Sequence, residues 1–291
     1  MRTRLKWLLL VMVSICSLAA CSKISLGYRN APLLATLWVD EVFDLPGAQS
    51  DAVRAALDET WDWHVGTPRL ELIALMRETA DRLDRPVREA DVAWAFDAFD
   101  RHSDVLGRVF ATQLARRWPA MTLDEATDVE QHLAARRAEL AEELADNTLE
   151  QQALQRTEKL VDDLEDWFGE VTDAQQVFIV RNEAMRLDRH IWLRERERRH
   201  GELIDIIKRN DVAALEDWVA NWREHRPAAV VAETQRREVI YRRFWTDFLN
   251  RATPAQIAHV QRRLREWATE LASVEVPEKL AQGQDALCTT C

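Results

Sequence analysis

Apolar residues recur at helical spacing along most of the chain, and no stretch shows the apolar–polar alternation typical of a strand. Ala, Leu, Glu and Arg, which favour helices, dominate the sequence, whereas glycine and proline are scarce and fall mainly between the periodic segments. The turns are short, which places consecutive helices side by side. The pattern therefore predicts an all-α fold, an elongated bundle of about eight to nine helices in antiparallel hairpins.

Short motifs mark where these helices begin and end. The pattern Thr-x-x-Glu/Gln lets two side chains bind free amides of the first turn, and it begins helices at Thr122, Thr148, Thr172 and Thr253. The longest predicted helix runs from Thr172 to about Arg209. The other predicted helices cover about residues 32–43, 49–64, 70–83, 88–118, 211–226 and 228–249.

The first predicted helix, which begins at Pro32, is strongly apolar. Leu33, Leu34, Leu37 and Trp38 follow one another within two turns. We expect this helix to pack deep in the domain, with contact with lipid headgroups as the alternative.

An apolar stripe in the longest predicted helix leads into arginines. The stripe consists of Val177, Val180, Ala184, Leu187 and Ile191. Its next two positions are Arg194 and Arg198, and a similar stripe in the helix after residue 228 contains Arg237. Because an unpaired buried arginine is costly, these three residues suggest an anion site for a phosphate, carboxylate or lipid headgroup. The alternatives are that the helix projects past the core, or that acidic groups of residues 40–170 pair with the arginines.

The first 21 residues have the pattern of a secretory signal. A basic head with Arg2, Arg4 and Lys6 precedes an apolar run over residues 7–18, which is too short to span a bilayer. The segment ends in Leu18-Ala19-Ala20-Cys21, which resembles the lipobox of bacterial lipoproteins. This resemblance implies cleavage before Cys21 and attachment of acyl chains such as palmitate to Cys21, which would hold the protein on a membrane. An ordinary secretory signal with a chance cysteine is the alternative.

The same resemblance gives an expected location. Ser22 follows the cysteine, and in Gram-negative lipoproteins a residue other than aspartate there implies sorting to the outer membrane, facing the periplasm. The expected division is a signal peptide over 1–20, a lipidated tether over 21–31, a helical periplasmic domain over 32–275 and a flexible tail over 276–291. Cys288 and Cys291 in the tail form a CxxC pair, which is a disulfide candidate in an oxidising compartment. This pair alone lacks the further ligands of a zinc site.

Charge and motifs narrow the classes of function. The formal net charge is −11, which disfavours a general nucleic-acid binder, and acidic residues concentrate in residues 40–170. No HExxH motif, Gly-rich phosphate loop or GxSxG motif occurs, and the histidines lack metal-ligand spacing. The sequence therefore predicts no enzyme, no metal and no cofactor. Binding is the expected activity. Trp192 and Trp245 are candidate partner anchors, and packing in the core or at helix junctions is the alternative for the tryptophans.

Two resemblances to known families add to this interpretation. The segments 45–49, 171–175 and 252–256 each end in Gln, four residues after Leu, Val or Ala. They resemble the LTxxQ motif of the periplasmic Spy and CpxP proteins, which are helical stress-response chaperones. Helix capping alone is the other interpretation.

The second resemblance covers most of the mature chain. The residues that carry it are Leu26-Gly27-Tyr28-Arg29-Asn30, Leu37-Trp38-Val39-Asp40, Gln49 and Trp63-His64. They resemble an uncharacterised family of proteobacterial lipoproteins, and the resemblance implies a helical domain facing the periplasm but no catalytic residue. We therefore expect an interaction or structural role at the outer membrane with an envelope protein as partner, or a Spy-like holdase as the alternative.

Overall fold

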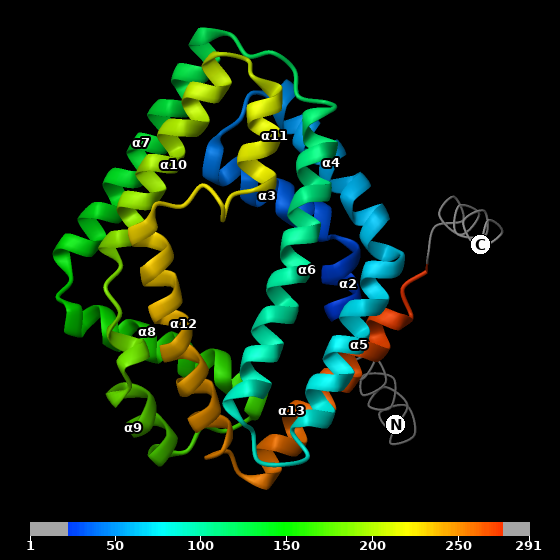
Figure 1. Ribbon diagram of the computed structural model, residues 1–291, viewed down its shortest axis with the longest axis vertical. Coiled ribbons are helices and arrows are strands. Elements are labelled where there is room, and N and C mark those ends of the chain that lie inside the picture. Colours follow the sequence, from blue (N-terminus) through cyan, green and yellow to red (C-terminus); the bar gives the residue numbers. More distant parts are fainter. Residues whose placement is uncertain (1–22, 276–291) are drawn as a thin grey trace, which may run out of the picture.

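The computed structural model describes residues 23–275, with side chains from residue 26 onward (Figure 1). Within this range the fold is all-α and contains no strand, which confirms the predicted class. The same residues form twelve α-helices and one 3-10 helix, so the expected number of eight to nine was wrong. Cys21, Cys288 and Cys291 lie outside the described residues. No described helix is long and apolar enough to cross a membrane.

The helices keep short connections throughout. Their bounds are α2 Lys23–Arg29, α3 Ala31–Phe43, α4 Gly47–Val65, α5 Thr67–Arg82, α6 Glu89–Ala115, α7 Leu123–Asp146, α8 Leu149–Phe168, α9 Asp173–Arg181, η1 Glu183–Arg186, α10 His190–Lys208, α11 Val212–Ala220, α12 Ala228–Leu249 and α13 Pro254–Ala272. Helix α2 lies within the segment expected to be a tether.

The helix expected from Thr172 to Arg209 is interrupted, so that prediction was wrong. Asn182 is extended, and its side-chain oxygen accepts a hydrogen bond from the amide of Ala184, which starts η1. Asp188 likewise accepts from the amide of His190 at 2.8 Å, where α10 begins. Short polar side chains that bind nearby amides compete with helix continuation. The apolar stripe from Val177 to Arg198 is therefore not one continuous face.

The predicted capping boxes are present at Thr122, Thr148, Thr172 and Thr253. Two of them also meet each other. The buried amides of Gln175 and Gln256 exchange hydrogen bonds of 2.9 and 3.0 Å, which joins the start of α9 to the start of α13. These glutamines therefore cap their own helices and link two of them.

Two asparagines join helix ends in a second recurring way. Asn210, which ends α10, binds both the amide and the carbonyl of Met121, just before α7. Asn250, which ends α12, binds the amide and the carbonyl of Val87, just before α6, at 2.9 and 2.8 Å. Each asparagine gives hydrogen-bond partners to a backbone amide and carbonyl in the connection just before a helix.

The helices form two closed circuits that share α6 (Figure 1). In the first, α3 packs on α4, α4 on α6, α6 on α11, α11 on α10, α10 on α7, and α7 on α3. In the second, α5 packs on α13, α13 on α8, α8 on η1, η1 on α12, α12 on α6, and α6 on α5. The result is a frame of helices with several axis directions.

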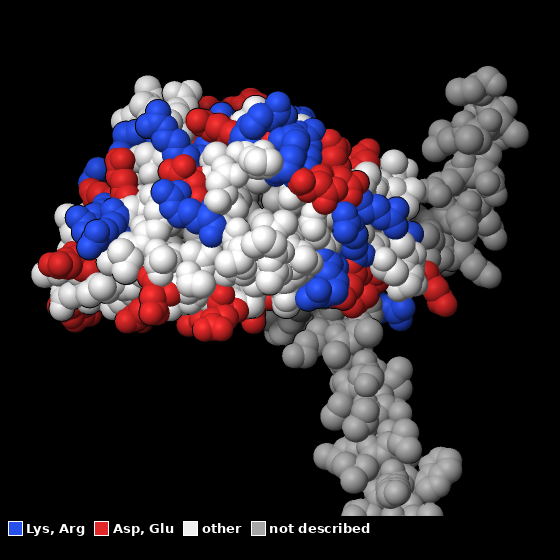
Figure 2. Space-filling model, turned by 90° about the horizontal axis from the view of Figure 1, so that it is seen from below, with Lys and Arg blue, Asp and Glu red and all other residues white. Residues whose placement is uncertain are grey.

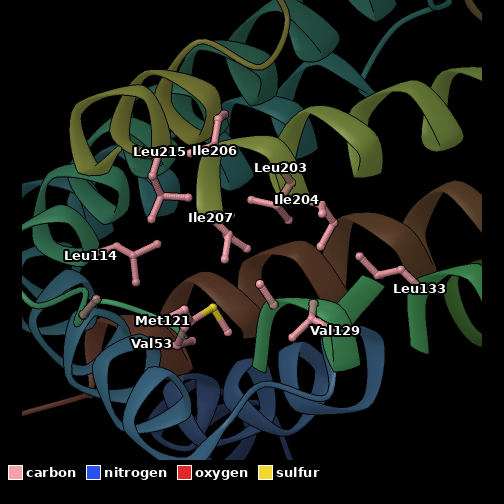
Figure 3. Packing of buried hydrophobic residues seen from close by; sticks show 12 residues of the cluster. Val53, Leu114, Met121, Val129, Leu133, Leu203, Ile204, Ile206, Ile207 and Leu215 are labelled. Atoms are coloured by element: carbon pink, nitrogen blue, oxygen red, sulfur yellow. The ribbon is translucent and has the colours of Figure 1, made fainter. Parts of the chain in front are cut away.

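Each circuit has its own apolar core. The first core gathers Leu114 of α6, Leu133 of α7, Leu203 and Ile207 of α10, and Leu215 of α11, with their side chains directed toward one another (Figure 3). The second core is aromatic and is built around the fully buried rings of Phe244 and Phe248. A small third cluster joins α5 to α13 around Ile73. All three clusters lie within residues 28–271, so a chain that begins at Ser22 keeps every core contact.

Helix α3 does not pack deep in the domain, which corrects the expectation for the first helix. Leu33, Leu34, Leu37 and Trp38 are all exposed, and Leu26 of α2 is exposed with them. The buried side of α3 is instead marked by Thr36, whose hydroxyl donates to the carbonyl of Pro32. An apolar face thus points to solvent directly after the amino-terminal segment.

Candidate functional site

The three arginines of the predicted anion site lie in different surroundings. Arg194 is exposed and has no hydrogen bond or ion pair within residues 26–275. Arg198 binds Glu195 at 2.7 Å and also Glu202. Both carboxylates lie on the same helix as Arg198, which also donates to the carbonyl of His225 at 3.0 Å. The structure does not bring the three arginines together into one pocket.

Arg237 has a mixed environment. Its guanidinium pairs with Glu233 at 2.6 Å, donates to the carbonyl of Asp188 and lies 5.5 Å from the ring centre of Trp192. Hydrogen bonds from Arg236 and then Arg237 lower the pKa of Glu233 to about 2. Arg237 is therefore already neutralised, but it lies beside a larger group of aromatic and basic residues.

This group, which we call the Trp–Arg cluster, occupies the junction of α10, α11 and α12. Its members are Trp192, Trp218, Trp222, Arg199, Arg223, Arg226 and Arg237. Each arginine lies over at least one indole ring, an arrangement in which the ring face attracts the cation. What distinguishes the arginines is the group that each one binds on its other side.

Arg199 and Arg223 have well-defined partners. Arg199 stacks 4.1 Å from Trp218 and donates to the carbonyls of Trp218 and Trp222, at the end of α11 where carbonyls lack helical partners. Arg223 forms ion pairs of 2.9 Å with Asp100 and Asp104 of α6. The hydrogen bond from Arg223 lowers the pKa of Asp100. These two arginines therefore hold the end of α11 to α10 and α6.

Arg226 is different because it has no carboxylate partner among the described residues. Its guanidinium lies 4.3 Å from the ring centre of Trp222 and 5.6 Å from that of Trp192, and its one side-chain hydrogen bond within residues 26–275 is a 3.5 Å contact to Thr234. Burial, followed by the nearby charge of Arg223, lowers its pKa. The outer edge of this half-buried guanidinium has the donors for a carboxylate or phosphate.

Sequence reasoning missed Arg226. The sequence predicts a helix over residues 211–226, which includes Trp222-Arg223-Glu224-His225-Arg226, whereas α11 ends at Ala220. The signal that was available is the density of Trp and Arg just before a proline that ends the segment. Turn residues carry binding groups more often than regular helix faces do.

A second polar arrangement lies under α2. The hydroxyl of Tyr28 is 2.8 Å from His64 Nδ1, and His64 Nε2 is 2.9 Å from His102 Nε2. Burial is the main cause that lowers the pKa of His64 to about 4 and raises that of Tyr28 to about 12. All three groups are thus neutral at pH 7. Their row of hydrogen bonds joins α2 to α4 and α6.

The face seen in Figure 2 has no large patch of one charge, because acidic and basic side chains lie next to one another there. Within the described residues, no group of three or more His, Cys, Asp or Glu side chains has the arrangement of a metal site. No protein-family model, curated protein or solved structure matches this chain.

Proposed function

We propose that the protein is a lipid-anchored envelope protein, held through acyl chains on Cys21 at the outer membrane of a Gram-negative bacterium and facing the periplasm. The observation that carries the proposal is the exposed apolar face of α2 and α3. Helix α2 begins at Lys23, two residues after Cys21, so any anchor at Cys21 would keep this face close to the lipid. Two acyl chains give stable anchoring.

Metabolic labelling tests the anchor directly. Cells that express the full chain are grown with an alkyne analogue of palmitate, and the purified protein is probed for the label. We expect labelling that is lost in Cys21→Ala and retained in the matched control Cys288→Ala. Labelling of Cys21→Ala equal to that of the unchanged chain would contradict the proposal.

The role of the anchored domain is proposed to be binding, with the Trp–Arg cluster as the place where an acidic group of a protein partner is held. The half-buried Arg226 forms no ion pair with a carboxylate within residues 26–275, and its one side-chain hydrogen bond is a 3.5 Å contact to Thr234. Trp and Arg are the residues most enriched at the energetic centres of protein interfaces. Pull-down of envelope proteins with Arg226→Ala and with Arg226→Lys tests this role. We expect both variants to lose the partner, because lysine lacks the planar fork.

A Spy-like holdase is the second candidate. Its support is the occurrence of the capping glutamines Gln175 and Gln256 in positions that resemble the LTxxQ motif, together with exposed apolar side chains. The acidic net charge of −11 weighs against a cradle that takes clients by positive charge. Suppression of aggregation of several unrelated unfolded proteins at near-stoichiometric amounts would favour the holdase, whereas one retained partner favours the adaptor.

A further inference from the structure

An exposed apolar face runs along α2 and α3. Its five side chains are between 43% and 60% exposed, and they are Leu26, Leu33, Leu34, Leu37 and Trp38. At 3.6 residues per turn they fall on one side of the two consecutive helices. We call them the α2–α3 apolar face. A cluster of large apolar groups of this kind in solvent marks an interaction surface.

The backbone under this face is firmly held. The carbonyl of Tyr28 accepts a 2.8 Å hydrogen bond from the indole of Trp61, and the hydroxyl of Tyr28 binds His64. Helix α2 also packs on α13, and α3 packs on α4 and α7. The apolar face is therefore presented by a fixed part of the domain.

A basic groove lies at one end of the same face. It has a volume of about 550 Å³, lies between α3, α7 and α10, and is lined by Trp38, Arg136, Arg137, Arg196 and His200 among others. Trp38 belongs to both the groove and the apolar face. Val42 and Phe43 also line the groove, which therefore combines basic and apolar side chains.

Two of the groove arginines have no partner. Arg137 and Arg196 have neither a hydrogen bond nor an ion pair among residues 26–275, whereas Arg136 binds Glu41. Two acidic residues also line the groove: Glu143 lies 3.9 Å from Arg189, and Glu139 is exposed. The unpaired guanidinium groups are therefore available to an external anion.

His200 adds a neutral polar group at this place. Burial, then the charges of Arg196 and Arg137, lower its pKa to about 4, so it is uncharged at pH 7. Its buried Nδ1 atom has no hydrogen-bond partner in the described chain. A buried polar atom without a partner is unusual and is satisfied when a ligand or water supplies one.

We propose that the α2–α3 apolar face and this groove form one docking surface for a bilayer that contains anionic phospholipid, with a headgroup phosphate held by Arg137 and Arg196. The apolar face enters the boundary between headgroups and acyl chains, where tryptophan is enriched. The inference rests on the proposed function in one respect: acylation of Cys21 places the face at the bilayer. The occupant is a bilayer rather than a protein because α2 begins two residues after Cys21, and Leu26, the first side chain of the face, lies five residues after it.

Vesicle binding by the unacylated chain of residues 22–291 tests the docking surface separately from the anchor. Flotation is compared for vesicles of phosphatidylcholine alone and vesicles with about one phosphatidylglycerol in four lipids. We expect preferential binding to the anionic vesicles. Arg137→Gln and Arg196→Gln should each weaken that binding about fivefold, and together about 20-fold. The matched control Arg194→Gln removes an equally unpaired charge from α10 outside the groove and should change binding less than about twofold.

The apolar part has its own variants. Leu34→Ser with Leu37→Ser should weaken binding to both kinds of vesicle about tenfold or more, because two exposed leucines no longer enter the interface. The control pair is Leu149→Ser with Leu154→Ser, two exposed leucines of α8, which should bind like the unchanged chain.

Three results would overturn the inference: no vesicle binding, unchanged binding by the double arginine variant, or complete displacement by millimolar inorganic phosphate, which would indicate a free-phosphate site. Because this assay uses unacylated protein, its failure leaves the palmitate-labelling result intact. Conversely, vesicle binding without labelling would retain the docking surface and reject the anchor.

Discussion

At the scale of single residues, the arginines differ chiefly in the partners they have. Arg223 is paired with two carboxylates of α6, whereas Arg226, three residues later, lies between two indoles without a carboxylate. Both are partly buried and both stack on Trp222. One of them therefore serves the fold and the other is available for binding.

This difference predicts different effects on stability. Arg223→Ala should lower the free energy of unfolding by about 1–2 kcal/mol, because Asp100 and Asp104 lose their shared partner. Arg226→Ala should lower it by less than about 1 kcal/mol, because it removes two stacking contacts and leaves no carboxylate without its ion-pair partner. Urea unfolding measures both, and equal losses would show that Arg226 has a structural role.

The buried histidine chain predicts a dependence of stability on pH. The pKa of His64 is about 4 in the folded chain and near 6.5 when unfolded, so the unfolded state binds more protons between these values. The contribution of neutral His64 to the free energy of unfolding is complete above about pH 6.5. It is lost as the pH falls toward 4, which lowers the free energy of unfolding by at most about 3 kcal/mol.

Urea unfolding between about pH 4.5 and 7 measures this effect. His64→Gln should weaken the dependence, while His200, whose pKa is also lowered to about 4, continues to contribute. Exposed His190→Gln is the matched control and should keep the full slope. A slope unchanged in His64→Gln would show that this histidine is not responsible.

At the scale of helices, the paired glutamines join two elements that are distant in the chain. Removing one of them leaves the other amide buried without its partner, so Gln175→Ala or Gln256→Ala should each lower the free energy of unfolding by about 2–3 kcal/mol. The double variant should cost clearly less than the sum, because neither buried amide remains. A double-mutant cycle measures this coupling, and strict additivity would contradict it. Exposed Gln151→Ala, from the cap of α8, is the control for capping alone.

The helices themselves were largely predictable from the sequence. Thr122, Thr148, Thr172 and Thr253 mark their helix starts because the capping chemistry is local. The break after Arg181 was missed, because the apolar spacing suggested a continuing helix while Asn182 ended it by a side-chain hydrogen bond.

The environment of a side chain was less predictable. The apolar character of α3 indicated burial, but whether such a helix is covered depends on which other helices pack on it. The Trp–Arg cluster was missed for the same reason, since it assembles residues of α10, α11 and α12 at a junction. From the sequence, Arg237 was the one arginine of this cluster that was predicted to bind an anion.

At the scale of the whole molecule, α6 belongs to both circuits and couples their cores. We expect the domain to unfold in one transition. Leu133→Ala in the first core and Phe248→Ala in the second should each lower stability by about 3–4 kcal/mol, because both side chains are almost completely buried. Both variants should move the same calorimetric transition. Two separate transitions, each moved by one variant only, would show that the circuits unfold independently.

The central claim is that the anchored domain binds a dedicated partner through the Trp–Arg cluster. Photocrosslinking in cells tests it most directly, with p-benzoylphenylalanine at exposed Ala229, three residues after Arg226, and at exposed Glu150 on α8 as the control position. We predict a small number of discrete protein adducts from position 229, lost when Arg226→Ala is added, and none from position 150. A broad smear from both positions, or adducts that persist with Arg226→Ala, would contradict the account.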